Sequence, residues 1–116
     1  MSNARPSLGV MVLYKNKRKG NGVTVEDLPF LRKLMIAGER MGIDIFWFTP
    51  EDVNDAKKTI HAYVLDQKSA KWKRKFTSFP DLIFDRCRYQ PTARFRKLRE
   101  FRAKYPNLNY LNRPMA

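Results

Sequence analysis

Residues 8–14 read LGVMVLY, an unbroken apolar run with polar residues on either side. Such a run is typical of a strand buried on both faces, as strands are in a parallel sheet covered by helices. Two further runs have the same character, IDIFWF at 43–48 and DLIFDR at 81–86. We therefore expect strands at 8–14, 43–48 and 81–85 that run parallel to one another.

Two amphipathic helices are predicted between these runs and after the last one. The first follows a start signal at Asp27 and Pro29 and stops at Gly42, with an apolar stripe of Phe30, Leu34, Ala37 and Met41. The second follows Pro91 and ends before Pro106, with a stripe of Phe95, Leu98, either Phe101 or Arg102, and Tyr105. Each stripe would pack against the sheet.

The segment after the second strand predicts a short helix and then a hairpin. Thr49 can cap the helix, and Asp52 can complete a capping box. The segments TIHAYVLD at 59–66 and KWKRKF at 71–76 alternate in polarity, which indicates two paired strands with one wet face. NLNYLN at 107–112 is expected to form a short terminal strand.

This order of elements predicts an α/β fold with an open, mainly parallel, Rossmann-like sheet, a β-hairpin insertion and flanking helices. The chain of 116 residues is about one domain long. We expect residues 7–116 to form a single domain, and residues 1–6 to be a cloning-tag remnant or a disordered tail.

Composition predicts a chain that folds and that has a strongly basic surface. Apolar residues make up 43% of the chain, enough to form a core, and 24 Lys plus Arg against 11 Asp plus Glu give a net charge of +13. Nucleic acid, phosphorylated ligands, an acidic partner and an anionic membrane surface all remain open, as does a solvated basic face on part of a larger protein. Cys87, the single cysteine, and the lack of a secretory h-region favour a reducing, intracellular compartment, and no apolar stretch is long enough to span a bilayer.

A candidate anion site follows from where the parallel strands would end. Ligands of open α/β sheets bind outside the carboxyl ends of these strands. The first and third exits carry basic residues and one carboxylate, namely Lys15, Lys17, Arg18, Lys19, Asp85, Arg86 and Arg88. Arginine can grip phosphate or carboxylate through two hydrogen bonds, and Asp85 could orient it. Alternatively, Asp85 and Arg86 pair with each other or with helix ends as architecture.

Other chemistry has little support in the sequence. The glycines at 20 and 22 fit neither a dinucleotide nor a P-loop motif. His61 is the only histidine and is interpreted as a strand residue, so no catalytic residue and no metal-ligand set is predicted. Arg86 and Arg88 would lower the pKa of the Cys87 thiol, although small-residue packing is the favoured role for Cys87.

A second function class is nucleic-acid binding. The predicted second helix is strongly basic, and the hairpin adds basic residues around Trp72, namely Lys71, Lys73, Arg74 and Lys75. Cations can take phosphates while bases stack on aromatic rings, as on single-strand-binding surfaces. Burial of Trp72 and Phe76 inside the hairpin is the alternative. A free-standing module that binds nucleic acid or another polyanion is therefore the competing hypothesis.

Several segments resemble the N-terminal region of the YheC/YheD family, endospore coat-associated proteins of the ATP-grasp type. The resemblance runs from about Leu8 to Pro114, and its most specific pieces are FTPEDV at 48–53 and FPDLIFDR at 79–86. It implies a pre-ATP-grasp domain, an α/β unit that packs beside the nucleotide-binding part and often helps to form the substrate side of the cleft.

The same resemblance sets the expected role of the chain. The sequence stops at 112–116, about where the ATP-grasp portion of such a protein would begin, so we expect a domain truncated from a longer chain. The domain alone would be non-catalytic. ATP and Mg²⁺ would bind only in a full-length, carboxylate–amine-ligase-like parent, whose ATP-grasp domain is the expected partner, together with an anionic substrate. The location would be cytoplasmic, with association to the spore coat.

Overall fold

The computed structural model describes residues 5–16, 23–25, 28–89 and 91–112. Its main sheet has six strands: β1 (Ser7–Met11), β4 (Asp44–Phe48), β5 (Val53–Asn54), β6 (Thr59–Asp66), β7 (Lys71–Ser78) and β8 (Leu82–Asp85). Two short strands, β2 (Lys15–Asn16) and β3 (Val23–Thr24), pair as a separate ribbon. The helices are α1 (Leu28–Met41), α2 (Ala93–Lys104) and a 3-10 turn, η1 (Pro50–Asp52).

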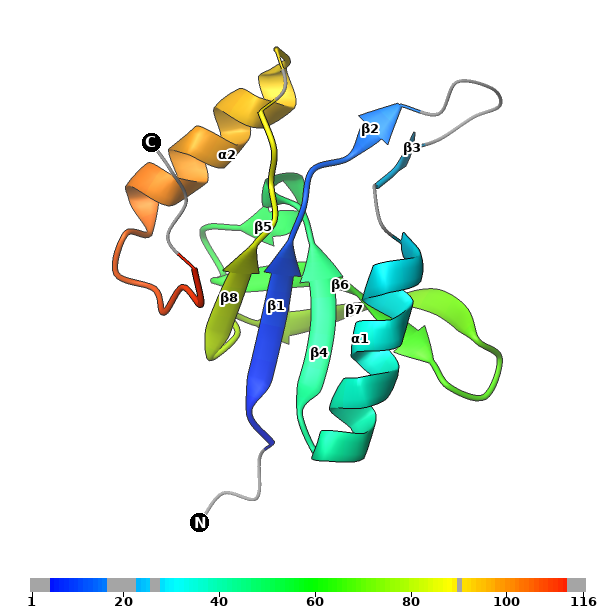
Figure 1. Ribbon diagram of the computed structural model, residues 1–116. Helices are drawn as coiled ribbons and strands as arrows, with labels where there is room; N and C mark the ends of the chain where they lie inside the picture. Colours follow the sequence, from blue (N-terminus) through cyan, green and yellow to red (C-terminus); the bar gives the residue numbers. More distant parts are fainter. Residues whose placement is uncertain (1–4, 17–22, 26–27, 90, 113–116) are drawn as a thin grey trace.

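The three predicted buried strands do form the parallel part of the sheet. β1 lies between β4 and β8 and pairs in parallel with both of them (Figure 1). Gly9 in β1 permits close packing, because a Cβ there would meet the Pro80 ring at 2.8 Å and the Phe48 ring at 3.0 Å. The predicted α/β class is therefore confirmed.

The predictions of a mainly parallel sheet and of a Rossmann-like arrangement are wrong. The hairpin β6–β7 is formed as expected, but β6 joins the sheet itself, antiparallel to β4 through Trp47 and Tyr63 and antiparallel to β5. The sheet is therefore mixed, with antiparallel pairing beyond β4. In Figure 1 the strands β6 and β7 cross behind β4, so the sheet is strongly curled.

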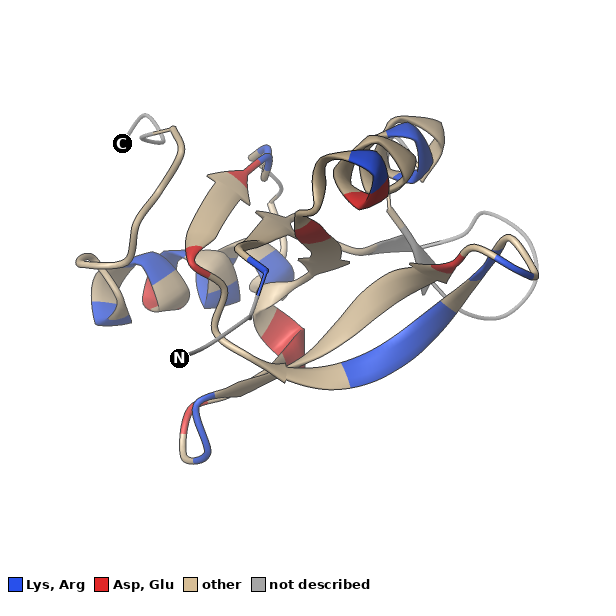
Figure 2. Cartoon of the chain, turned by 90° about the horizontal axis from the view of Figure 1, so that it is seen from below, with Lys and Arg blue, Asp and Glu red and all other residues tan. Residues whose placement is uncertain are grey.

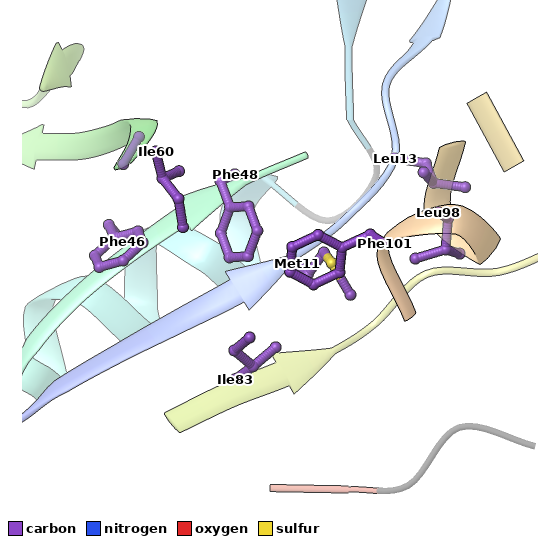
Figure 3. Packing of buried hydrophobic residues seen from close by; sticks show 9 residues of the cluster. Met11, Leu13, Phe46, Phe48, Ile60, Ile83, Leu98 and Phe101 are labelled. Carbon is purple, nitrogen blue, oxygen red and sulfur yellow. The ribbon is translucent and has the colours of Figure 1, made fainter. Parts of the chain in front are cut away.

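Each face of the parallel strands has its own apolar cluster, because successive side chains point to opposite faces. Val10 and Trp47 pack with Leu31 and Met35 of α1. On the other face, Met11, Phe46, Phe48 and Ile83 pack with Leu98 and Phe101 of α2, as Figure 3 shows. Both helices thus cover the sheet, one on each side.

The apolar stripe predicted for the first helix is displaced. The buried residues are Leu31, Met35 and Gly38, whereas Met41 is 71% exposed. The buried residues have the helical spacing that was predicted, but each lies one position later in the sequence, so a neighbouring row of the helix faces the sheet. Gly38 explains why this row faces the sheet. A Cβ at position 38 would lie 2.5 Å from the Ile45 side chain, so the glycine lets α1 approach β4 closely.

Several smaller expectations also changed. Thr49 donates its backbone N–H to the Asp52 carboxylate at 2.9 Å, as the capping box requires, but the helix it begins is only one 3-10 turn. The expected terminal strand at 107–112 is reduced to a single parallel bridge between Tyr110 and Ile83. Arg5, assigned to the N-terminal tail, forms ion pairs with Glu39 and Asp44.

Candidate functional site

The carboxyl ends of β1, β4 and β8 lie side by side at one edge, at the top of the sheet in Figure 1. Backbone hydrogen bonds hold the exits together. The Val12 N–H donates to the Phe48 carbonyl at 3.0 Å, and the Arg86 N–H donates to the Met11 carbonyl at 2.9 Å. The residues that follow these strands are therefore brought together, as the sequence predicted.

Asp85 forms a buried anchor at the end of β8. Its side chain is fully buried, and one carboxylate oxygen accepts a hydrogen bond from Arg102 Nε of α2 at 2.9 Å. The other oxygen accepts the Cys87 N–H at 3.0 Å. The backbone of Asp85 exchanges two hydrogen bonds of 3.0 Å with the Asn112 amide. Asp85 therefore ties α2 and the C-terminal segment to β8.

Arg86 faces the opposite side of the sheet. Its guanidinium carbon lies 4.5 Å from the ring centroid of Phe30 in α1 and 5.5 Å from that of Phe84. These are cation–π distances, which place the charge at the start of α1. Arg88 is exposed one residue before the exposed Tyr89, which contacts Phe95 edge-on. The two arginines therefore sit on the edge itself, whereas Asp85 lies beneath it.

The basic residues after β1 are only partly described. Lys15 opens β2 directly beyond the buried Tyr14, so its backbone belongs to the edge. Lys17, Arg18 and Lys19 lie outside the described residues. The structure thus places Lys15, Arg86 and Arg88 at the predicted edge.

The Cys87 thiol differs from its sequence-based description. Burial raises its pKa well above the usual value, the nearby Asp85 carboxylate raises it further, and Arg102 opposes the change only in part. The Sγ atom lies 3.5 Å from the Met11 carbonyl. The expectation that Arg86 and Arg88 would favour the thiolate is therefore wrong, because the thiol is buried beside a carboxylate.

A second polar cluster at this end of the sheet was missed by sequence reasoning. The Tyr14 hydroxyl donates to the Asp52 carboxylate at 3.2 Å and lies 2.6 Å from the Tyr63 hydroxyl. Arg74 donates to Asp52 at 2.6 Å, and its guanidinium lies 4.1 Å from the Tyr63 ring centroid. Tyr63 in turn stacks on Trp47 at 3.8 Å. The capping motif at 49–52 was the only signal for any member of this cluster.

The clustered carboxylates are already engaged by protein groups. Asp85 binds Arg102, and Asp52 binds Arg74 and Tyr14. Across the described ranges, no group of three or more His, Cys, Asp or Glu side chains could hold a metal ion. His61 lies in β6 as interpreted and stacks on Phe76. What this edge offers chemically is the exposed Arg88 and Tyr89, with the half-buried Arg86 beside Phe30.

Comparison with known proteins finds no family model that matches the chain and no curated protein that matches it significantly. The resemblance to the YheC/YheD family therefore stays a prediction from sequence motifs. Among the helices of the described residues, none is long and apolar enough to cross a membrane.

The Asp85 anchor predicts a large cost for its removal. Asp85→Ala leaves the partly buried Arg102 without its carboxylate, and breaking a buried pair in this way costs about 3–5 kcal/mol. Asp44→Ala is the matched control, because its ion pair with Arg5 is exposed and should contribute less than about 1 kcal/mol. Urea unfolding measures both. Equal losses for the two variants would refute the anchoring role.

Tyr14 predicts a dependence of stability on alkaline pH. Burial, followed by the hydrogen bond with Tyr63 and the charge of Asp52, raises the pKa of Tyr14 well above its usual 10.0. The neutral hydroxyl is thus favoured in the folded protein. Its contribution is complete below pH 10 and is lost as pH rises above that value, because the unfolded chain then ionises first.

The comparison of the wild type with Tyr14→Phe isolates this effect. At neutral pH the variant should be less stable by about 1 kcal/mol, the usual net contribution of a hydrogen bond. Each pH unit above 10 removes about 1.4 kcal/mol of the wild-type advantage, so by pH of about 11 the variant should be at least as stable. Urea unfolding at several pH values, with the exposed Tyr89→Phe as control, provides the measurement. A constant gap between wild type and Tyr14→Phe would contradict this account.

Proposed function

We propose that this chain is the N-terminal pre-ATP-grasp domain of a YheC/YheD-like, spore coat-associated protein. In this role it packs beside an ATP-grasp domain and contributes its basic strand-exit edge to the substrate side of the cleft. The domain itself is non-catalytic, and ATP and Mg²⁺ are bound by the partner domain. The proposed location is the cytoplasm, with association to the spore coat in sporulating bacteria.

The observation that carries this proposal is the convergence of basic residues at one edge. Lys15, Arg86 and Arg88 follow adjacent parallel strands, and the backbone bond from Arg86 to Met11 fixes two of these exits together. Ligands of α/β sheets collect at such edges. The motifs FTPEDV and FPDLIFDR supply η1 and β8, so the segments that carry the resemblance form two of the structures around this edge.

The division of labour between the two domains also has support. Asp52 and Asp85 are held by Arg74 and Arg102, and the exposed Arg88 adds positive charge at the edge to which an anion would bind. Arginine suits that purpose because its planar fork can bind phosphate or carboxylate through two hydrogen bonds. Positive charge at the edge would also complement an acidic surface on the neighbouring domain.

Anion binding at the edge gives the test of this proposal. Inorganic pyrophosphate, a compact polyanion, is titrated into the wild type and into the double variant Arg86→Ala/Arg88→Ala by isothermal calorimetry. We expect at least a tenfold loss of affinity, with a stability loss near 1 kcal/mol from the missing contact of Arg86 with Phe30.

The control is Arg96→Ala/Arg99→Ala, which removes the same charge from exposed positions on α2. Equal losses in both double variants would show a response to net charge alone and would overturn the edge site. The competing polyanion-binding module predicts a larger effect in α2. It also predicts an affinity whose logarithm falls linearly and steeply with the logarithm of salt concentration.

A further inference from the structure

The outer edge of β7 is open in the described part of the sheet. β7 spans eight residues, and all of its pairing runs along one side, to β6, from Lys71 opposite Asp66 to Ser78 opposite Thr59. Figure 2 shows β7 as the outermost strand, marked by the blue of its basic residues. A strand with a free edge is a template for another extended chain.

The pairing pattern shows which backbone groups point to this open edge. The Phe48 carbonyl bonds to β1, so the backbone of its neighbour Trp47 faces β6, where it pairs with Tyr63. Backbone groups alternate along a strand, and Tyr63 therefore faces β4 while Ala62 and Val64 face β7.

The same alternation continues across the hairpin. Ala62 lies opposite Lys75, and Val64 lies opposite Lys73, so the backbone of both lysines is used by β6. Arg74 and Phe76, between and beyond them, direct their N–H and C=O groups outward. The edge thus offers regularly spaced donors and acceptors over the whole length of β7.

Along this edge one face carries a row of lysines, and the other carries Trp72, Arg74 and Phe76, of which Arg74 is bonded to Asp52. Lys71, Lys73 and Lys75 alternate on the first face, all of them exposed, although Lys73 already contacts Asp66 at 2.9 Å. On the second face Phe76 is 71% exposed and stacks on His61 with 4.2 Å between the ring centroids. Trp72, by contrast, packs edge-on against Trp47.

This pattern discriminates between occupants of the edge. A second copy of the chain pairing β7 against β7 would bring two lysine rows together, and like charges across paired strands are destabilising. An extended segment with carboxylates at alternate positions would place them opposite the lysines. Its intervening apolar side chains would then lie on the same face as Phe76.

We propose that the open edge of β7 binds an extended acidic polypeptide segment as an additional strand of the sheet. Backbone hydrogen bonds to Arg74 and Phe76 supply the pairing, and the lysine row selects for acidic residues at every second position. This is strand addition, in which main-chain bonds give affinity and alternate side chains give specificity. The inference does not depend on the proposed role beside an ATP-grasp domain.

The test uses a synthetic peptide of alternating Glu and Val and three comparison ligands. These are a peptide of the same composition with its Glu residues in one block, the alternating peptide with alternate backbone nitrogens methylated, and oligothymidylate. We expect the alternating peptide to bind at least tenfold more tightly than either comparison peptide. It should also slow hydrogen exchange of the Arg74 and Phe76 amides, whereas those of Lys73 and Lys75, already paired with β6, should change little.

Charge reversal tests the selectivity. Lys71→Glu/Lys75→Glu should lower affinity for the alternating peptide at least tenfold, and Lys97→Glu/Arg99→Glu on α2 should leave it within about threefold, with circular dichroism confirming that both variants fold. Equal loss in both variants, or equal binding of the methylated peptide, would overturn the proposal. Slowed exchange at Phe76 with oligothymidylate alone would assign this surface to nucleic acid instead.

Discussion

The two-sided burial of β1 is the constraint on which the rest of the structure depends. Val10 and Met11 are both fully buried, one under α1 and the other under α2. Both edges of the strand are also taken, by β4 and by β8, in parallel pairing. Because β4 and β8 both run parallel to β1, the chain leaves all three strands at the same end of the sheet. The polar residues that follow β1, β4 and β8 therefore collect at a single edge.

The charged residues at the end of β8 have separate roles. Asp85 is buried and holds α2 through Arg102, so this carboxylate belongs to the architecture. Arg86 turns to the α1 side and lies against Phe30 and Phe84, while Arg88 reaches the surface. One short segment thus contacts both helices and places Arg88 at the surface of the edge. Asp85 therefore has a structural role, whereas the proposed functional role belongs to Arg86 and Arg88.

Sequence reasoning succeeded where local pattern determines structure. The apolar runs, the hairpin and the cap at Thr49 were predictable because each depends on neighbouring residues. The direction of pairing was not, since alternation in β6 marks a strand but does not say which edge it joins. The row of α1 that faces the sheet depends on the close approach at Gly38, and the spacing of hydrophobic residues does not reveal that a glycine belongs to the buried row.

The missed features of the site share one cause. Tyr14, Asp52, Tyr63 and Arg74 come from four separate segments, and only the folded sheet brings them together. Likewise, the Cys87 thiol responds to Asp85 and Arg102 and to burial, so its sequence neighbours were the wrong guide to its pKa. Properties that depend on contacts between distant segments were accessible only from the structure.

The central functional claim is that this domain works beside an ATP-grasp domain in one polypeptide. The most direct measurement is the size of the native polypeptide that an antibody raised against this domain detects in cells of the source organism. The account predicts a band several times larger than the 13.7 kDa of this chain. A band at 13.7 kDa would contradict it and would make the basic module that binds polyanions on its own the better description.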